Sequence, residues 1–397
     1  PLTGRVVRPF VPKLEVKTAT GEDTIKFARD IAPVIAAQCL DCHAGGQPAA
    51  RLSLNDFQSI LAGNREGLIL TPGKPGESKL IKRLRGTEGQ QMPLRKPALP
   101  EETIAKFEKW IAEGATFDGS DPRTPTARVA AIYAVSQMTH EQIAEQRVGE
   151  AERNWRLANP DDSPQRAENA NYLALGNVGE ERLKEVVNLA ETLQSRVGAM
   201  FKAPSGQPLI KGRLTFFVFN RRFDYSEYGQ MVEKREIPST WRGHWNFLIT
   251  DAYACLYPPQ FEDEGTLQPL VAEQLAGAYL DSLGEMPRWF TQGSAWEVAS
   301  RITPRDPLVT GRESRLEQAL GRMTAADDFL TGKISPDDAT LVNYSFAKFL
   351  MGRTNAARYQ MLLDAVSKGM EFDKAFMGAF KAEPKQLAAI WARTLRR

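Results

Sequence analysis

The sequence predicts a mainly α-helical fold, with an all-α domain first and then an α+β, mostly helical domain that has a small sheet. Three observations predict this order. Apolar residues recur at helical spacing over most of the chain. One stretch, RLTFFVFN at 213–220, is rich in aromatic and β-branched residues, as a strand is. The stretch FDGSDPRTPTAR at 117–128 is rich in turn-forming residues and separates two helical regions.

In the N-terminal region, two helices are expected to flank a middle segment rich in Gly and Pro. Residues 1–20 show no sustained period and predict an extended arm. Apolar residues at helical spacing predict the first helix over 25–38. The segment PEETIAKFEKWIAEGA predicts the second over 101–114, because Pro100 and the two glutamates after it suit a first turn.

Beyond this region the expected elements are helices, apart from the single strand. A polar, helical connector is expected over 121–165, and a further helix over 179–201. The last four helices are expected near residues 340–351, 356–369, 371–381 and 384–396. The predicted domains are therefore an arm at 1–20, a first domain at 21–120, the connector at 121–165 and a second domain at 166–397.

Composition and charge give no reason to expect nucleic acid or a lipid surface as a partner. Of the 397 residues, 42% are hydrophobic and 25% charged, as in ordinary globular proteins. The 51 basic and 49 acidic residues give a net charge of +2, so nothing favours nucleic acid or anionic lipid as a partner. No apolar run reaches the length of about 18 residues that a transmembrane segment needs. Because the chain begins at Pro1 and shows no signal-peptide pattern, we expect a mature, processed chain.

The run CLDCH at 39–43 has the C-x-x-C-H pattern of c-type haem attachment. Two thiols one helical turn apart can each reach a vinyl group of the porphyrin, and the adjacent histidine then lies under the iron. A zinc half-site would need about two further Cys or His ligands. The candidates for these are Cys255, His140 and His244. A thioredoxin-like redox pair is expected near a βαβ unit, and none precedes the motif. The motif therefore predicts one covalently bound haem c, held by Cys39, Cys42 and His43.

The sixth ligand of the haem iron is expected to be Met92, in the run QQMPLRKP. It lies 92 − 43 = 49 residues after His43, in a Pro-flanked loop just before the helix at 101–114. A thioether opposite a histidine stabilises ferrous iron and suits electron transfer. The alternatives are that Met92 fills the core and that His140 or His244 ligates the iron instead.

Five segments together resemble planctomycete-type monohaem cytochrome c domains, which are similar to class I cytochromes. In order they are FARDIAPVIAAQCLDCH, LSLNDFQSILAG, ILTPGKPGESKLIKRL, QMP and LPEETIAKFEKWIAEGA, within about residues 21–118. The resemblance implies Cys39 and Cys42 as thioether attachments, His43 as proximal ligand and Met92 as distal ligand. It also implies that the two predicted helices pack across each other. Since covalent haem attachment occurs outside the cytoplasmic membrane, it implies a periplasmic or cell-surface protein.

The remainder, roughly residues 167–397, resembles gluzincin-like peptidase domains through the order of several short segments. Among them are NYLALGNVGEERLKEVVNLAETL, RLTFFVFNRRFDYSEYGQMVE, VAEQLAGAYL and MPRWFTQGSA. In that family the active helix reads H-E-x-x-H, and a later W-x-x-E-G segment supplies the third zinc ligand. The matching positions here are Ala272, Glu273, Ala276 and Gln292. Because alanines replace both histidines and an amide replaces the third ligand, we expect no zinc and an inactive pseudo-peptidase.

These patterns predict an exported one-electron carrier with no catalytic residue, whose peptidase-like domain docks a redox protein or cell-envelope subunits. The alternative is a structural subunit of an envelope complex, in which haem mainly stabilises the fold. A haem-dependent or hydrolytic enzyme is disfavoured by Met92 and by the missing zinc ligands. His244 is expected to be structural, His140 solvated and Cys255 a buried small hydrophobe. The sequence does not specify an oligomeric state.

Overall fold

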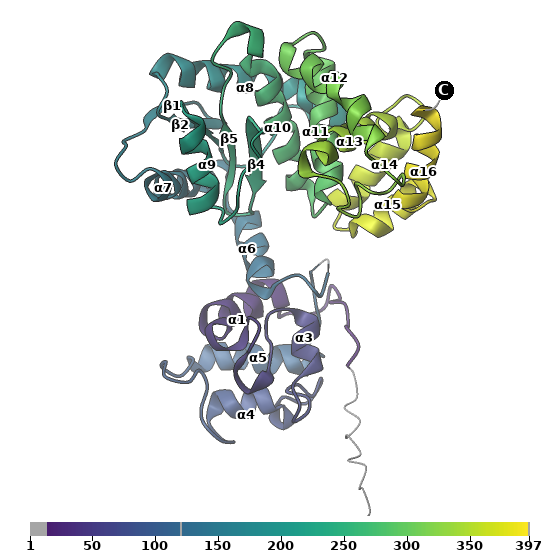
Figure 1. The fold of residues 1–397 in the computed structure, drawn as a ribbon. Helices are drawn as coiled ribbons and strands as arrows, with labels where there is room; N and C mark the ends of the chain where they lie inside the picture. The colour runs from purple at the N-terminus through teal and green to yellow at the C-terminus, as the bar shows by residue number, and fades with distance from the viewer. Residues whose placement is uncertain (1–13, 120, 396–397) are drawn as a thin grey trace, which may run out of the picture. The chain divides into compact units, whose positions relative to one another are not determined.

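A computed structural model describes residues 14–119 and 121–395, which form two compact units divided between Gln137 and Met138 (Figure 1). The division lies within the segment predicted as a connector. Most of the arm predicted at 1–20 lies outside the described residues. We call the two parts the N-terminal unit and the C-terminal unit, and describe each by itself.

The N-terminal unit is built of short helices. The first predicted helix begins as a π-helical turn η1 (Phe27–Ile31), continues as α1 (Ala32–Gln38) and, after Cys39, ends in the single turn α2 (Leu40–His43). The remaining elements are η2 (Ala49–Arg51), α3 (Phe57–Ala62), η3 (Pro75–Glu77), α4 (Lys79–Arg85), α5 (Glu101–Ala112) and α6 (Thr126–Gln137). Helix α5 confirms the prediction for 101–114 to within two residues.

An aromatic cluster forms the centre of the N-terminal unit. Phe27, Phe57, Trp110 and Phe117 are all buried. The ring centroids of Phe27 in η1 and Trp110 in α5 lie 5.7 Å apart, and those of Phe27 and Phe57 lie 4.9 Å apart in an edge-to-face arrangement. The two helices that were expected to pack across each other therefore do so, through the π-helical turn of the first one.

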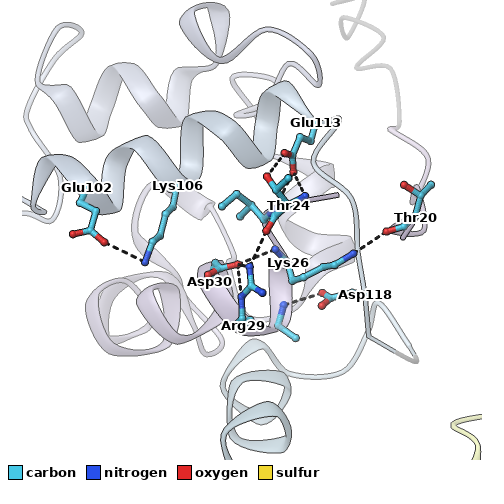
Figure 2. A network of polar contacts seen from close by, with 11 residues as sticks. Thr20, Thr24, Lys26, Arg29, Asp30, Glu102, Lys106, Glu113 and Asp118 are labelled. Carbon is cyan, nitrogen blue, oxygen red and sulfur yellow. Dashed lines mark hydrogen bonds and ion pairs between the residues drawn. The ribbon is translucent and has the colours of Figure 1, made fainter. Parts of the chain in front are cut away.

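Acidic side chains from the residues that follow α5 hold the chain at the start of this first helix (Figure 2). Glu113, directly after α5, accepts hydrogen bonds from the backbone N–H groups of Thr24 and Ile25, both at 3.1 Å. Asp118 accepts one from the N–H of Ala28 at 2.8 Å. The first N–H groups of a helix have no partner within the helix. Here Asp118, 90 positions later in the chain, supplies such a partner for Ala28, and Glu113 holds the residues just before the helix, which together fix the helix that leads into the CLDCH turn.

The C-terminal unit contains a five-stranded sheet with the order β1-β2-β3-β5-β4. The strands are β1 (Gln165–Glu168), β2 (Tyr172–Gly176), β3 (Leu214–Val218), β4 (Gly243–Phe247) and β5 (Ala252–Leu256). The three central strands are parallel, and the two edge strands pair antiparallel to them. Only β3 was predicted. The runs YLALG and AYACL, which form β2 and β5, are buried on both faces and lack the alternation that marks a half-exposed strand.

Helices cover both faces of this sheet. Alternate strand residues face opposite sides, so Phe216 packs with α8 and α10 while Phe217 packs with the aromatic side chains of α7 and α9. Figure 1 shows α10 beside β4 and β5. The helices of this unit are α7 (His140–Ala158), α8 (Glu180–Phe201), α9 (Arg222–Met231), α10 (Leu267–Leu283), α11 (Arg288–Ile302), α12 (Pro307–Gly321), α13 (Pro336–Leu350), α14 (Ala356–Ser367), α15 (Phe372–Phe380) and α16 (Pro384–Leu395).

Helices α8, α14, α15 and α16 match their predicted positions to within two residues, whereas α13 begins four residues before its predicted start. The start of α7, inside the predicted connector, was missed. Helix α7 begins directly after Thr139, whose hydroxyl accepts from the backbone N–H of Gln142 while the Gln142 side chain accepts from the N–H of Thr139. This T-x-x-Q capping box is a sequence signal for a helix start, and it divides the predicted connector. Over the described ranges, every helix is too short or too polar to span a bilayer.

Candidate functional site

The CLDCH run forms one tight turn at the end of the first helix. The N–H of Cys39 donates to the carbonyl of Ile35 at 2.9 Å, and the N–H of His43 donates to the carbonyl of Cys39 at 3.0 Å. Both motif thiols are free; Cys39 is half-buried and Cys42 exposed. The backbone thus holds the two sulfurs and the imidazole on one helical turn, as the spacing predicts.

The imidazole of His43 is fixed by a backbone carbonyl. Its Nδ1 lies 3.1 Å from the oxygen of Leu52. A carbonyl oxygen can only accept, so Nδ1 must donate, and the lone pair of the neutral ring is then on Nε2. The N–H of Leu54 also donates to the carbonyl of His43 at 2.8 Å. This arrangement presents Nε2 as a metal ligand whose orientation is set by the second nitrogen.

The loop that contains Met92 lies next to the CLDCH turn. The N–H of Met92 donates to the carbonyl of Arg83 at 2.9 Å, which holds the loop against α4. Four residues later, the ammonium of Lys96 lies 2.9 Å from a carboxylate oxygen of Asp41 and 3.3 Å from the carbonyl of Ala37. Asp41 lies between the two motif cysteines. The predicted distal ligand and the attachment motif are therefore tied together by one ion pair.

Burial also raises the pKa of one of the two motif thiols. Desolvation, opposed by the charge on Lys96, raises the pKa of Cys39 to about 11. Near neutral pH this thiol is therefore almost entirely protonated, and it is a weak nucleophile by itself. Cys39 and Met92 both pack against the core of the unit and are half-buried.

The donor set in this region suits haem c. Two unpaired thiols one turn apart, an oriented imidazole and a thioether on the adjacent loop are the groups that covalent haem with His–Met ligation uses. Cys39 and Cys42 would hold the porphyrin, and His43 and Met92 would be the axial ligands. Over residues 14–119 and 121–395, no three His, Cys, Asp or Glu side chains are grouped so as to hold a metal ion.

Comparison with known proteins agrees with this site. Residues 39–94 match the family described as planctomycete cytochrome C, a match that starts at the first motif cysteine and ends just after Met92. The N-terminal unit thus contains a c-type cytochrome domain, a class whose cofactor is haem c. No curated protein matches the chain.

In the C-terminal unit, the four positions of the predicted degenerate site lie on two packed helices. Ala272, Glu273 and Ala276 are on α10 and Gln292 is on α11, and all four are buried. Glu273 is not a lone charge, because Arg312 of α12 donates to its carboxylate at 3.1 Å. The sequence offered no signal for this pair, whose members lie 39 residues apart.

The predictions for the other two histidines have different outcomes. His244 is fully buried, with its Nδ1 2.7 Å from the hydroxyl of Tyr225 and its Nε2 2.9 Å from the carboxylate of Glu233. The expectation of a structural histidine is confirmed. His140 is not simply solvated, as was expected: its Nδ1 accepts from the N–H of Gly212 and its Nε2 lies 3.0 Å from a carbonyl, so both nitrogens have partners. Cys255 is buried, as predicted.

Proposed function

We propose that this protein is a one-electron carrier in which a single haem c is bound at the CLDCH turn with His43 and Met92 as axial ligands. The observation that supports this most directly is the turn itself, where both thiols are free and the His43 ring presents Nε2 to a ligand. When bound, haem c supplies a reversible one-electron couple. The half-buried Met92, on a loop anchored at Arg83 and Lys96, supports a closed, six-coordinate iron and not an open catalytic face.

The chain's own residues have three tasks in this proposal. Cys39 and Cys42 hold the porphyrin, and the carbonyl of Leu52 holds the proximal imidazole in one tautomer. The ion pair of Lys96 with Asp41 keeps the distal loop against the attachment turn. Because the Asp41 side chain is 76% exposed, solvent screens this ion pair and it adds little to stability, so its role is positioning.

We further propose that the protein is exported to the periplasm or cell surface, since haem c attachment takes place outside the cytoplasm. The C-terminal unit is then an inactive, gluzincin-like domain that docks a redox partner or envelope subunits. Support comes from the buried positions of Ala272 and Ala276 on α10, where the resemblance places zinc-binding histidines. A methyl group at each position provides no metal ligand.

The test is visible spectroscopy of the purified full-length protein and its Met92→Ala variant. We expect covalent haem in denatured protein, and a low-spin spectrum with the weak far-red band of methionine–iron ligation. The variant should become high-spin, because the thioether is lost while His43 and both thioether bonds remain. Met361→Ala, at an exposed methionine of α14, is the matched control and should keep the wild-type spectrum.

Three outcomes would each contradict a part of the proposal. An unchanged low-spin spectrum in Met92→Ala would assign the sixth position to another residue. A high-spin wild-type spectrum would indicate an open iron and favour an enzyme over a carrier. Zinc in stoichiometric amount would contradict the inactive peptidase-like assignment of the C-terminal unit.

A further inference from the structure

Positive charge is concentrated in the last part of the chain. The residues that follow α13, 351–397, include nine basic and four acidic residues, a net charge of 9 − 4 = +5. The rest of the chain then has 51 − 9 = 42 basic and 49 − 4 = 45 acidic residues, a net charge of −3. The whole-chain charge of +2 is therefore an average over two parts of opposite sign. A local excess of this kind indicates an anionic partner that the average does not reveal.

Most basic side chains of this region have no ion pair among the described residues. Of the seven between residues 351 and 395, Lys385 lies 3.2 Å from a carboxylate oxygen of Asp327. In the part of the chain that the structure describes, no carboxylate pairs with the other six, which are Arg353, Arg358, Lys368, Lys374, Lys381 and Arg393. All six are exposed. Because nearby carboxylates do not neutralise them, these cations can attract an anionic partner.

Each of the last three helices also exposes one large apolar side chain. Met361 of α14 is 56% exposed, Met377 of α15 is 41% exposed and Ile390 of α16 is 47% exposed. Residues three positions apart lie on the same face of a helix. Three positions from each apolar residue stands an unpaired basic one, in turn Arg358, Lys374 and Arg393. The exposed face of each helix thus combines an apolar side chain with a cation.

The three helices cover one aromatic cluster, which places their outer faces on the same side. Their buried rings contact rings of α11 and α13, in the pairs Tyr359–Phe290, Phe372–Trp289 and Trp391–Phe346. The Trp289 ring also contacts those of Phe290 and Phe346, with centroids 5.6 and 5.4 Å apart. Figure 1 shows α14, α15 and α16 grouped at the C-terminal end of the chain. These helices therefore form one layer, with the basic and apolar side chains on its outer side.

The kinds of side chain on this layer favour a lipid surface over a protein or nucleic acid. Four of the seven basic residues are lysines, and lysine is depleted in protein–protein interfaces. A lysine stem can follow an apolar surface while its ammonium stays among polar headgroups. All aromatic side chains of the three helices are buried, so they offer no stacking surface for nucleic-acid bases.

We propose that the layer formed by α14, α15 and α16 binds the surface of a membrane that contains anionic lipids. Its lysines and arginines contact the phosphate headgroups. Met361, Met377 and Ile390 enter the boundary between headgroups and acyl chains, as the apolar residues of interfacial helices do. This inference goes beyond the electron-carrier function and does not depend on haem.

The experiment is sedimentation of the full-length, haem-loaded protein with lipid vesicles at about 0.1 M salt. Phosphatidylcholine vesicles with about 30% phosphatidylglycerol should bind the protein, and pure phosphatidylcholine vesicles at least about tenfold less. Each basic residue near an anionic surface contributes roughly a fivefold factor to binding. The triple variant Arg358→Gln, Lys374→Gln and Arg393→Gln should therefore bind on the order of a hundredfold more weakly.

A second triple variant tests the apolar contribution. Met361→Ser with Met377→Ser and Ile390→Ser should weaken binding to the anionic vesicles about tenfold, because less apolar surface leaves water. Leu157→Ser, at a residue of α7 that is 48% exposed, is its control and should bind like the wild type. Circular dichroism shows whether each variant is folded.

A charge-matched variant separates the layer from the net charge of the protein. Arg156→Gln, Arg196→Gln and Arg305→Gln together remove three positive charges from exposed positions outside residues 351–397. This variant should bind the anionic vesicles like the wild type. Salt at about 1 M should release the wild type, because the Debye length falls to about 3 Å.

Several results would overturn the proposal. These are no binding to anionic vesicles, equal binding to both kinds of vesicle, or an equal loss in the charge-matched variant and in the triple variant of the layer. Binding to immobilised polyglutamate without binding to vesicles would assign the layer to an acidic protein partner instead. Sedimentation does not depend on iron ligation, so its failure is distinguishable from failure of the spectroscopic test of Met92.

Discussion

The two units differ in how the residues of their polar sites are spaced along the sequence and how deeply they are buried. In the N-terminal unit the attachment residues lie within positions 39–43, half-buried or exposed, on a turn that backbone hydrogen bonds hold. In the C-terminal unit Glu273 and Arg312 are 39 residues apart and largely buried between packed helices. Covalent attachment of a cofactor fixes the spacing of its residues in the sequence. An ion pair requires only that two elements pack, so its members leave no local pattern.

The largest effect is expected from breaking the pair in the C-terminal unit. Arg312→Met leaves the carboxylate of Glu273, 7% exposed, without the guanidinium that forms an ion pair with it. We expect the free energy of unfolding to fall by about 3–5 kcal/mol, as for other buried pairs that lose one partner. Urea unfolding followed by circular dichroism measures the loss, and hydrogen exchange should locate it in α10 to α13 and not in α5.

The double variant Glu273→Leu with Arg312→Met is the control for this comparison. Replacing both partners by apolar side chains removes the unpaired charge, so stability should return to within about 1 kcal/mol of the wild type. If the double variant were as unstable as Arg312→Met, the loss would come from packing on Trp296 and not from the ion pair. That result would contradict the electrostatic explanation.

A smaller effect with a distinct pH signature is expected at Asp251, also in the C-terminal unit. Burial, opposed by Arg147, raises the pKa of this carboxyl to about 6 from an ordinary value of 3.8. Because the folded state holds the proton more tightly than the unfolded state, stability falls as the pH rises from about 4 to about 6. Asp251→Asn removes the ionisation and should be about 2–3 kcal/mol more stable than wild type above pH 6, but not at pH 4.

Urea unfolding of wild type and Asp251→Asn at pH 4 and pH 8 checks this prediction. The amide oxygen of the variant can still accept from Asn154, which donates to Asp251 at 3.2 Å. Asp373→Asn, at an exposed position of α15, should show no pH-dependent difference. A gain of equal size at both pH values would mean that the charge of Asp251 is not its cause.

The sequence predicts the features that a local pattern specifies and misses those that depend on how elements pack. The CLDCH turn, α5 and α8 were all predicted, because a covalent spacing or an amphipathic period specifies each of them locally. Strands β2 and β5 were missed because a uniformly apolar run does not distinguish a buried strand from a buried helix. The partner of Glu273 was missed for another reason: it depends on how the packing of α11 and α13 brings α12 near α10, and no local pattern encodes that.

The smallest effect is expected at Glu113 in the N-terminal unit, where stability should depend on pH in the opposite direction to that at Asp251. This carboxylate accepts from the N–H groups of Thr24 and Ile25 (Figure 2). Partial desolvation raises its pKa, but the hydrogen bonds from Thr24 and Ile25 outweigh that effect and leave the pKa lowered. The folded state therefore holds the proton less tightly, so the contribution of Glu113 is present above its unfolded pKa of 4.5 and is lost as the pH falls.

Glu113→Gln should cost about 1 kcal/mol at pH 7, since the amide accepts more weakly than the carboxylate and the site is partly solvated. The difference from wild type should shrink toward zero as the pH falls well below 4.5, where Glu113 is protonated. Glu102→Gln, in the first turn of α5 and 85% exposed, is the matched control and should change stability little at either pH. Hydrogen exchange over residues 24–32 measures the effect where it arises, because Glu113 bonds the N–H groups of Thr24 and Ile25 just before the helix that leads into CLDCH. Acid should thus stabilise the C-terminal unit through Asp251 and weaken the N-terminal unit through Glu113. A loss at Glu113 that grew on acidification would contradict both the role assigned to these hydrogen bonds and the contrast between the units.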